Sequence, residues 1–272
     1  HGYMLFYHEA TVRDGGLDPA KPPATLTDWL NWSTQLTRGD IHGASYSTNW
    51  WTFHHFLRQA GADIFSPDGQ KAGFNNGAGV AAMTALSDLW QRNNHPLPVG
   101  ALDLLEQRRL ATLLNGPWNL NRLGQPSSPA FNDLRVAFAP QMNPAKPAWW
   151  AQSHQLALPK QQQVDEAKRT AAFNFVLWLT EHTLDWSQAG QLPANRKVLT
   201  SDGFQRSNHP VHQHLKVWER HLSSAAFMTL HPKYVDIEST LGPVLNRGMM
   251  RELSPQAALV DLEQAVNALL AQ

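Results

Sequence analysis

Tryptophan is the residue type in this chain best suited to contact a ligand. The sequence holds eleven tryptophans and no cysteine. A tryptophan ring offers a flat apolar surface with one N–H donor, which matches the C–H face and hydroxyl edge of a sugar ring. Most of the eleven are expected to be core, but Trp118 ends a strand-to-helix turn, where ligands bind in open α/β sheets. The composition therefore indicates aromatic stacking as the chemistry to look for.

A second aromatic candidate begins a predicted helix over residues 50–60. Adjacent helix positions point in different directions, so one of Trp50 and Trp51 should face the core and the other a cleft. We assign Trp51 to the cleft. Asn49 precedes them, and two interpretations stay open for it: contact with vicinal hydroxyls of a ligand, or capping of the helix.

Several other function classes lack support in the sequence. The 22 basic and 22 acidic residues balance, which gives no electrostatic case for nucleic acid or an anionic membrane. Neither a phosphate-binding glycine loop nor a Gly-x-Ser-x-Gly elbow nor a zinc motif occurs. His212 and His214 are two apart on a predicted helix and so face apart. We therefore expect no cofactor, no metal site and no catalysis.

The elements that must position these side chains alternate between strands and helices. Apolar runs predict strands over 3–7, 110–114, 134–138 and 155–158, and residues 41–49 are expected to form a loop. Apolar residues at helical spacing predict helices near 25–36, 50–60, 80–90, 164–182, 210–222 and 255–269. Thr25 and Asp28 predict a capping box. Four tryptophans fall on helical apolar stripes and are expected to be core: Trp29, Trp90, Trp178 and Trp218. The alternation predicts the α/β class.

Short motifs in a fixed order resemble one protein family. They are Gly16-Leu17-Asp18-Pro19, Ala60-Gly61-Ala62-Asp63, Asn115-Gly116-Pro117-Trp118, Ser153-His154 with Leu156 to Lys160, and Gly190-Gln191-Leu192-Pro193-Ala194. Together they resemble the extracellular solute-binding proteins of carbohydrate ABC importers, the maltose or multiple-sugar-binding type. The resemblance runs over nearly the whole chain. Trp149 and Trp150 stand where that family often has paired glycines, which leaves the ligand open.

This resemblance implies a two-lobed periplasmic-binding-protein-like α/β fold. Residues 1–150 would form the second, C-terminal lobe, 151–205 would return to the first lobe, and 206–272 would be C-terminal helices of the second lobe. The N-terminal part of the first lobe is expected to be missing from this chain, supplied by a further segment or chain. Residues 151–205 would then carry an uncovered apolar face.

The resemblance also implies where ligand is bound and by which partners. Trp118 would stack on the sugar, and Trp150, Ser153 and His154 would lie at the crossover between lobes. Tyr234 would reach the cleft from the final return, whereas Glu238 is interpreted as part of a solvated loop. The expected partners are a sugar or oligosaccharide and the membrane permease of the importer. The expected place is periplasmic or extracellular, at the membrane through the importer or a lipid anchor.

Two alternative functions stay open at this point. A carbohydrate-active enzyme would need a pair of carboxylates about 5–10 Å apart across an aromatic-lined cleft. The same receptor fold could instead bind a phosphorylated polyol. That ligand would need a basic residue in the cleft, and Arg196 is the nearest candidate.

Overall fold

A mixed four-stranded sheet organises the chain. The computed structural model describes residues 1–92 and 100–272. The strand order is β2-β3-β1-β4, with β2 parallel to β3 and β1 antiparallel to both β3 and β4. The strands are β1 (Met4–His8), β2 (His42–Tyr46), β3 (Leu110–Asn115) and β4 (Leu134–Ala137). A second, two-stranded sheet pairs β5 (Trp149–Ala151) in parallel with β6 (Ala225–Phe227).

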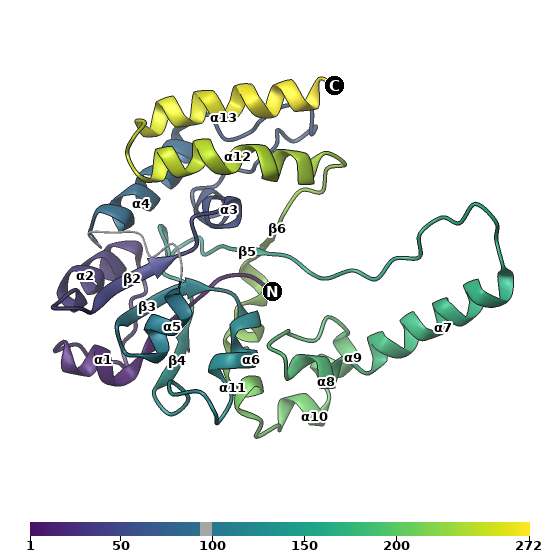
Figure 1. The fold of residues 1–272 in the computed structure, drawn as a ribbon, viewed down its shortest axis with the longest axis horizontal. Coiled ribbons are helices and arrows are strands. Elements are labelled where there is room, and N and C mark those ends of the chain that lie inside the picture. The colour runs from purple at the N-terminus through teal and green to yellow at the C-terminus, as the bar shows by residue number, and fades with distance from the viewer. Residues whose placement is uncertain (93–99) are drawn as a thin grey trace.

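Helices cover the four-stranded sheet on both faces (Figure 1). One face packs against α2 (Leu26–Leu36), α3 (Trp50–Gln59), α4 (Gly77–Arg92), α12 (Tyr234–Met249) and α13 (Pro255–Leu270). The other packs against α5 (Ala101–Glu106), α6 (Leu120–Leu123), α10 (Asp202–Gln205) and α11 (Pro210–Arg220). The remaining helices are α1 (Glu9–Asp14), η1 (Pro117–Asn119), α7 (Glu166–Glu181), α8 (Thr183–Ser187), α9 (Arg196–Leu199) and η2 (Leu222–Ser224).

The strands divide most of the interior into two large cores by simple alternation, and a smaller third cluster forms around Tyr7, Val12, Trp32 and Leu36. Tyr3 and Leu5 enter the first core, which α3, α4, α12 and α13 cover. Met4 and Phe6 enter the second core, on the side of α11. Successive strand side chains point to opposite faces, so a strand buried on both faces reads as a continuous apolar run. The strand predicted over 3–7 is confirmed as β1 for this reason.

The small sheet links the two cores in the same way. On β5, Trp150 enters the first core and Trp149 enters the second, and both are almost fully buried. The Trp149 Nε1 donates to the carbonyl oxygen of His221 at 2.8 Å, which satisfies its one polar atom. This pair of tryptophans therefore anchors the end of β5 on both sides of the molecule.

Helix starts follow the signals in the sequence. Thr25 Oγ1 accepts from the Asp28 backbone N–H at 3.0 Å, and the Asp28 carboxylate accepts from the Thr25 N–H at 3.1 Å. This reciprocal capping box is the one that the sequence predicts. Ser254 caps α13, with Pro255 in its first turn, where the missing N–H costs nothing.

Two predictions of secondary structure were wrong. Residues 41–49 were expected to form a loop, yet His42–Tyr46 form β2 beneath α2. Gly43 permits this packing, because a Cβ there would lie 2.0 Å from the Ser33 carbonyl oxygen. Conversely, residues 155–158 are exposed and form no strand. Apolar sequence alone does not make a strand, because strand backbone needs a neighbour for its hydrogen bonds.

Helix α7 projects from the body as an arm (Figure 1). It contains no buried residue, and the side chains of Phe175 and Trp178 are 59% and 52% exposed. The prediction that Trp178 is core is therefore wrong in this structure, whereas Trp29 and Trp218 are fully buried and Trp90 is partly buried. We call residues 152–182 the arm.

The chain rejoins the body after the arm. Leu184, Leu192 and Leu199 pack against the second core, and Phe204 is fully buried in it. The assignment of residues 151–205 to a first lobe stays a prediction. Within the described part of the chain, no helix combines the length and apolar character that a bilayer span requires.

Candidate ligand-binding site

Trp118 lies at the turn where β3 meets η1. The Asn115 Oδ1 accepts from the Gly116 N–H at 2.8 Å, and Pro117 opens η1. The Trp118 ring folds back over Gly116, where a Cβ would lie 2.1 Å from ring carbons. Only glycine allows this close approach. The Asn-Gly-Pro-Trp motif therefore sets the direction of the partly exposed Trp118 ring.

Trp51 presents a second ring from the start of α3. It stacks on Trp150, with ring centroids 5.4 Å apart and planes 10° apart. Trp150 is fully buried, so it supports the Trp51 ring from behind. Trp51 is half-buried and keeps part of its surface open, whereas Trp50 is almost fully buried against Phe53 and Phe74. The two adjacent tryptophans thus divide as the helix geometry predicts.

The rings of Trp51 and Trp118 form an angled corner. Their centroids are 6.5 Å apart and their planes meet at 67°. Tyr3 lies between them and the core, 6.0 Å from Trp118 and 5.1 Å from Trp150 by ring centroids. We call Tyr3, Trp51, Trp118, Trp150 and Tyr234 the aromatic cluster. Two inclined apolar faces of this kind suit a ring-shaped ligand with apolar faces of its own.

Tyr234 joins the aromatic cluster from α12. Its hydroxyl accepts a hydrogen bond from the Trp51 Nε1 at 2.9 Å. Burial, together with the negative charge of Glu238, raises the pKa of Tyr234 above its ordinary value. The interpretation of Glu238 as part of a solvated loop is wrong, because residues 234–249 form a helix and Glu238 is partly buried.

Asn49 acts as the cap of α3. Its Oδ1 accepts from the Thr52 backbone N–H at 3.0 Å, from the Thr52 hydroxyl at 3.1 Å and from the Tyr3 hydroxyl at 3.3 Å. The capping alternative is therefore realised. A contact between Asn49 and ligand stays a prediction, and it would use the amide nitrogen, because the oxygen is already occupied.

Ser153 and His154 lie apart from the aromatic cluster. Both are exposed, just beyond β5, and they line a cavity of about 420 Å³. Its other walls include apolar side chains of the arm, of α8 and of the turn after α8, among them Leu156, Leu179, Trp186, Leu192 and Pro193. His1 links the two places, with its ring centroid 4.6 Å from His154 and 5.6 Å from Trp118. The predicted site residues therefore form two neighbouring groups.

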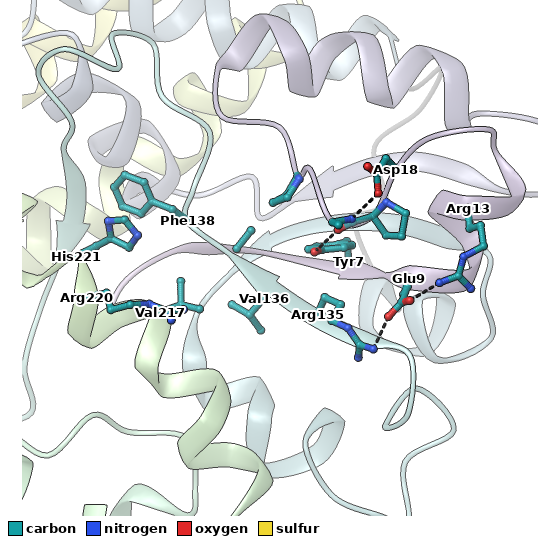
Figure 2. Close-up of a pocket in the computed structure, with 14 residues that line it drawn as sticks. Tyr7, Glu9, Arg13, Asp18, Arg135, Val136, Phe138, Val217, Arg220 and His221 are labelled. Carbon is teal, nitrogen blue, oxygen red and sulfur yellow. Dashed lines mark hydrogen bonds and ion pairs between the residues drawn. The ribbon is translucent and has the colours of Figure 1, made fainter. Parts of the chain in front are cut away.

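A separate groove of about 610 Å³ runs along β4 (Figure 2). Its walls are the loop around Pro19 and the end of α11, where His221 stacks on Phe138 with ring centroids 3.8 Å apart. Strand β4 is the edge of the sheet. Edge strands expose unpaired backbone, and proteins protect them by keeping them short and charged.

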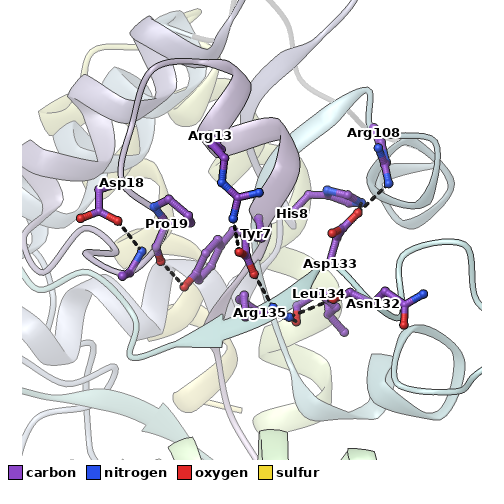
Figure 3. A network of polar contacts seen from close by, with 12 residues as sticks. Tyr7, His8, Arg13, Asp18, Pro19, Arg108, Asn132, Asp133, Leu134 and Arg135 are labelled. Atoms are coloured by element: carbon purple, nitrogen blue, oxygen red, sulfur yellow. Dashed lines mark hydrogen bonds and ion pairs between the residues drawn. The ribbon is translucent and has the colours of Figure 1, made fainter.

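Charged side chains in and beside this groove form ion pairs with other side chains of the protein (Figure 3). Glu9 forms ion pairs with both Arg13 and Arg135. The Tyr7 hydroxyl donates to the carbonyl oxygen of Pro19 at 2.8 Å. Arg108 binds the Asp133 carboxylate at 2.6 Å. A four-residue strand flanked by paired charges is a protected edge, so we interpret this groove as structural.

Metal binding finds no support in the described residues. Across residues 1–92 and 100–272, no group of three or more histidine or acidic side chains could hold an ion. His212 instead contacts the hydroxyls of Ser187 and Ser207, each 2.7 Å from a ring nitrogen. These contacts join α8 to α11, which is a structural role.

Sequence reasoning missed one residue of the aromatic cluster and misjudged the surroundings of a second residue close to it. Tyr3 was expected only as part of a strand, yet its ring reaches both Trp118 and Trp150. Glu238 lies one helical turn beyond Tyr234 on α12, and its negative charge acts on the Tyr234 hydroxyl. Their spacing of four would have placed Glu238 on the face of Tyr234 once a helix was assigned there.

Comparison with known proteins identifies the fold and the family. The chain aligns with a cyclic alpha-maltosyl-1,6-maltose binding protein from Arthrobacter globiformis at 21% identity and a TM-score of 0.80, covering 99% of this chain and 70% of that one. A sugar-binding protein from Xanthomonas citri aligns at 18% identity and a TM-score of 0.80, covering 99% and 69%.

A maltose/maltodextrin-binding domain from Bdellovibrio bacteriovorus, bound to maltotriose, aligns at 18% identity and a TM-score of 0.76, covering 100% and 71%. These likenesses confirm the mixed α/β fold of periplasmic binding proteins. A search among curated proteins finds no match. The sequence profile described as "bacterial extracellular solute-binding protein" matches residues 2–183, well over half of the chain, which therefore belongs to that family.

Proposed function

We propose that this protein is the substrate-binding component of an ABC importer and binds a sugar or oligosaccharide at the aromatic cluster. The family binds solutes and is non-catalytic, so the prediction that the chain is not an enzyme is confirmed by its family. Three structurally similar proteins are named for saccharides that they bind. The observation that carries the proposal is the angled corner of Trp51 and Trp118.

Each part of the aromatic cluster has a role in this proposal. The open face of Trp51 stacks on one sugar ring, and Trp118 contacts a neighbouring face or a second ring. Trp150 keeps the Trp51 ring in place from below, because the two rings are stacked and Trp150 is fully buried. The amide nitrogen of Asn49 and the Tyr234 hydroxyl supply hydrogen bonds at the rim. Rigid aromatic platforms bind with little loss of side-chain freedom.

The arm supplies the opposite side of the site in this proposal. Ser153 and His154 would meet the ligand from there, as residues 151–205 return to a first lobe while 1–150 and 206–272 form the second. The exposed apolar side chains of α7 would pack against further α/β structure of the first lobe, in the region of the solved relatives that this chain does not cover. Closure of two lobes around ligand is then a hinge motion.

The partners and the location follow from the same proposal. A closed, loaded receptor would deliver the sugar to the membrane permease of the importer. The protein would work on the extracellular or periplasmic side, held at the membrane by the importer or by a lipid anchor.

The phosphorylated polyol alternative gains nothing from the structure. It needs a basic side chain beside the aromatic cluster. Arg196 is exposed on α9 and has no described contact with the residues of the cluster, whereas the charge that acts on Tyr234 is that of the acidic Glu238.

Calorimetric titration with a panel of maltose, maltotriose, tagatose and ribitol tests the proposal. We expect wild-type protein to bind at least one of them, and Trp118→Ala to weaken binding by more than about tenfold, the equivalent of roughly 1.4 kcal/mol. Trp90→Ala removes a partly buried tryptophan on α4, outside the cluster, and serves as the control.

Thermal melts of all variants separate folding from binding. Unchanged affinity in Trp118→Ala would end the stacking role of that residue. Failure of the wild-type protein to bind any of the panel would overturn the proposed function.

A further inference from the structure

The ring of His1 lies between the aromatic cluster and the cavity that Ser153 and His154 line. Its centroid is 5.6 Å from that of Trp118, in an edge-to-face contact, and 4.6 Å from that of His154. His1 also forms part of the cavity wall. A ligand that reaches from the aromatic cluster into the cavity would therefore pass the His1 side chain.

The backbone that carries this ring is fixed by residues far away in the sequence. The His1 amino group donates to the Gln152 carbonyl oxygen at 2.8 Å, and the Gln152 N–H donates back to the His1 carbonyl oxygen at 2.8 Å. The Gly2 carbonyl oxygen accepts from the Trp218 Nε1 at 2.9 Å. A Cβ on Gly2 would lie only 1.9 Å from the Trp150 carbonyl oxygen. The His1 side chain thus extends from a backbone with little freedom to move.

One hydrogen bond orients the imidazole of His1. Its Nδ1 lies 3.2 Å from the Oε1 of Gln191, in the turn where the chain rejoins the body. An amide oxygen can only accept, so Nδ1 carries the proton. In a neutral imidazole the other nitrogen, Nε2, then holds a lone pair and accepts hydrogen bonds. Gln191 therefore selects the tautomer in which Nε2 is an acceptor.

This Nε2 is the ring nitrogen left to bind a ligand. Across residues 1–92 and 100–272, the described hydrogen bond of the ring is the one from Nδ1 to Gln191. His1 is only partly buried, and it faces the cavity. The imidazole is thus held by one nitrogen and offers the other, which is how proteins position a histidine that binds something else.

The aromatic cluster is poor in free acceptors. Its indole rings carry only N–H donors. The Asn49 Oδ1 already accepts from the Thr52 N–H, the Thr52 hydroxyl and the Tyr3 hydroxyl. A sugar hydroxyl that is taken out of water without an acceptor for its proton is unfavourable. His1 Nε2 supplies such an acceptor beside Trp118.

We propose that His1 binds the ligand through Nε2, which accepts a hydrogen bond from a sugar hydroxyl where the aromatic cluster meets the cavity. This inference rests on the proposed function of the aromatic cluster. His1 then determines specificity, because a saccharide without a hydroxyl at that point leaves Nε2 unpaired in a partly desolvated place.

A purely structural role for His1 makes the opposite prediction for two variants. Asparagine places an amide nitrogen near the position of Nδ1, so His1→Asn keeps a donor for Gln191 and loses the Nε2 acceptor. Glutamine places an amide oxygen near the position of Nε2, so His1→Gln keeps the acceptor and loses the bond to Gln191. Ligand contact requires that His1→Gln binds better, whereas a structural role requires that His1→Asn does.

Calorimetric titration with maltotriose compares these variants with the wild-type protein. His1→Asn and His1→Phe should weaken binding by about five- to tenfold, the usual effect of losing one hydrogen bond between uncharged groups. His1→Gln should stay within about threefold of wild type. His221→Phe makes the same change at the groove along β4 and should bind as wild type does. Thermal melts confirm that the variants fold.

Monodeoxy derivatives of maltotriose identify the hydroxyl that His1 contacts. Wild-type protein should bind one of these derivatives about five- to tenfold more weakly than maltotriose. His1→Phe should bind that derivative and maltotriose to within about twofold, because the partner of the missing hydroxyl has already been removed. A change that acts only on the fold would weaken both ligands equally and leave their ratio as in wild type.

Each other outcome decides against the inference. Wild-type affinity in His1→Phe would overturn it, as would retained affinity in His1→Asn together with weakened affinity in His1→Gln. Additive losses in the deoxy series would also overturn it, and all three results leave the sugar-binding proposal intact. Wild-type protein that does not bind maltotriose overturns the inference, and binding of another sugar from the panel would then leave the proposed function standing.

Discussion

Helices α7 and α11 both carry apolar side chains that the sequence predicts to be buried, and the two helices have opposite fates. On α11, Leu215 and Trp218 are fully buried, and the Trp218 Nε1 donates to the Gly2 carbonyl oxygen at 2.9 Å. On α7, Phe175 and Trp178 are more than half exposed. Both helices show the spacing that defines an apolar face. The difference teaches that helical periodicity predicts which side chains share a face, but not whether anything covers that face.

The arm exposes many apolar side chains. Side chains with more than 40% exposure extend along the arm from the segment after β5 to the end of α7: Leu156, Leu158, Val164, Phe173, Phe175, Leu177 and Trp178. Exposed apolar side chains gathered on one segment indicate an interaction site. The body, by contrast, has packed cores on both faces of the sheet. The following predictions test whether the arm and the body differ in stability as they differ in burial.

Hydrogen exchange should show the largest difference. Local opening free energies range from near zero to the global value, so amides of α7 should exchange at least about a thousandfold faster than those of α4. Mass spectrometry of peptides from both helices measures this on the monomeric chain. Equal slow exchange in both would mean that α7 is stabilised on its own and that the comparison with α11 fails.

Truncation of the two tryptophans should give the next largest contrast. Trp218→Ala should lower the free energy of unfolding by about 3–5 kcal/mol, because it empties a fully buried site. Trp178→Ala should cost less than about 1 kcal/mol, because its ring is half exposed. Urea unfolding of both variants provides the values. Similar losses would show that the arm contributes to the cooperative unit.

Gly190 tests where the chain rejoins the body. Its φ is +91°, and a Cβ would lie 2.0 Å from the Pro117 carbonyl oxygen. Gly190→Ala should therefore cost about 2–3 kcal/mol, from backbone strain and the clash together. Gly61 is a matched control, because its φ is +89° and nothing lies within 4 Å of the added carbon. Gly61→Ala should cost only about 1 kcal/mol.

Gly190→Ala should also affect the binding site. Pro117 begins η1, which carries Trp118, so Gly190→Ala should also weaken sugar binding, and Gly61→Ala should not. If Gly190→Ala and Gly61→Ala lower the free energy of unfolding equally and bind sugar with equal affinity, then Gly190 does not fix residues 183–205 to the body.

Much of the site could be predicted because local rules decide it. The division between Trp50 and Trp51 follows from helix geometry alone, and the position of Trp118 follows from a strand-to-helix turn with glycine and proline. The rest depended on contacts distant in sequence. Trp150 was predicted as a ligand contact, yet full burial places it behind Trp51. Nothing near residue 150 in the chain signals that partner, which lies about a hundred positions earlier.

The prediction of secondary structure failed where segments distant in sequence decide whether a strand forms. The residues of β2 include His42, Gly43 and Ser45, which read as polar, but they pair with β3 and lie under α2. The apolar residues Leu156 and Leu158 read as a strand, but no described strand lies beside them. Strand propensity mostly reflects how a side chain packs against its neighbours in a sheet. It therefore gives a wrong prediction where the neighbours are absent or where small polar residues are buried.

The sequence by itself determined the α/β class, the helix caps at Thr25 and Ser254, and the family through its ordered motifs. Those features depend on residues close together in the chain. Only the tertiary structure decided that Trp51 and Trp118 meet at an angle, that Trp150 lies behind Trp51, and that the Trp51 Nε1 donates to the Tyr234 hydroxyl. Such contacts join residues far apart in sequence, whose meeting depends on how the sheet and helices pack.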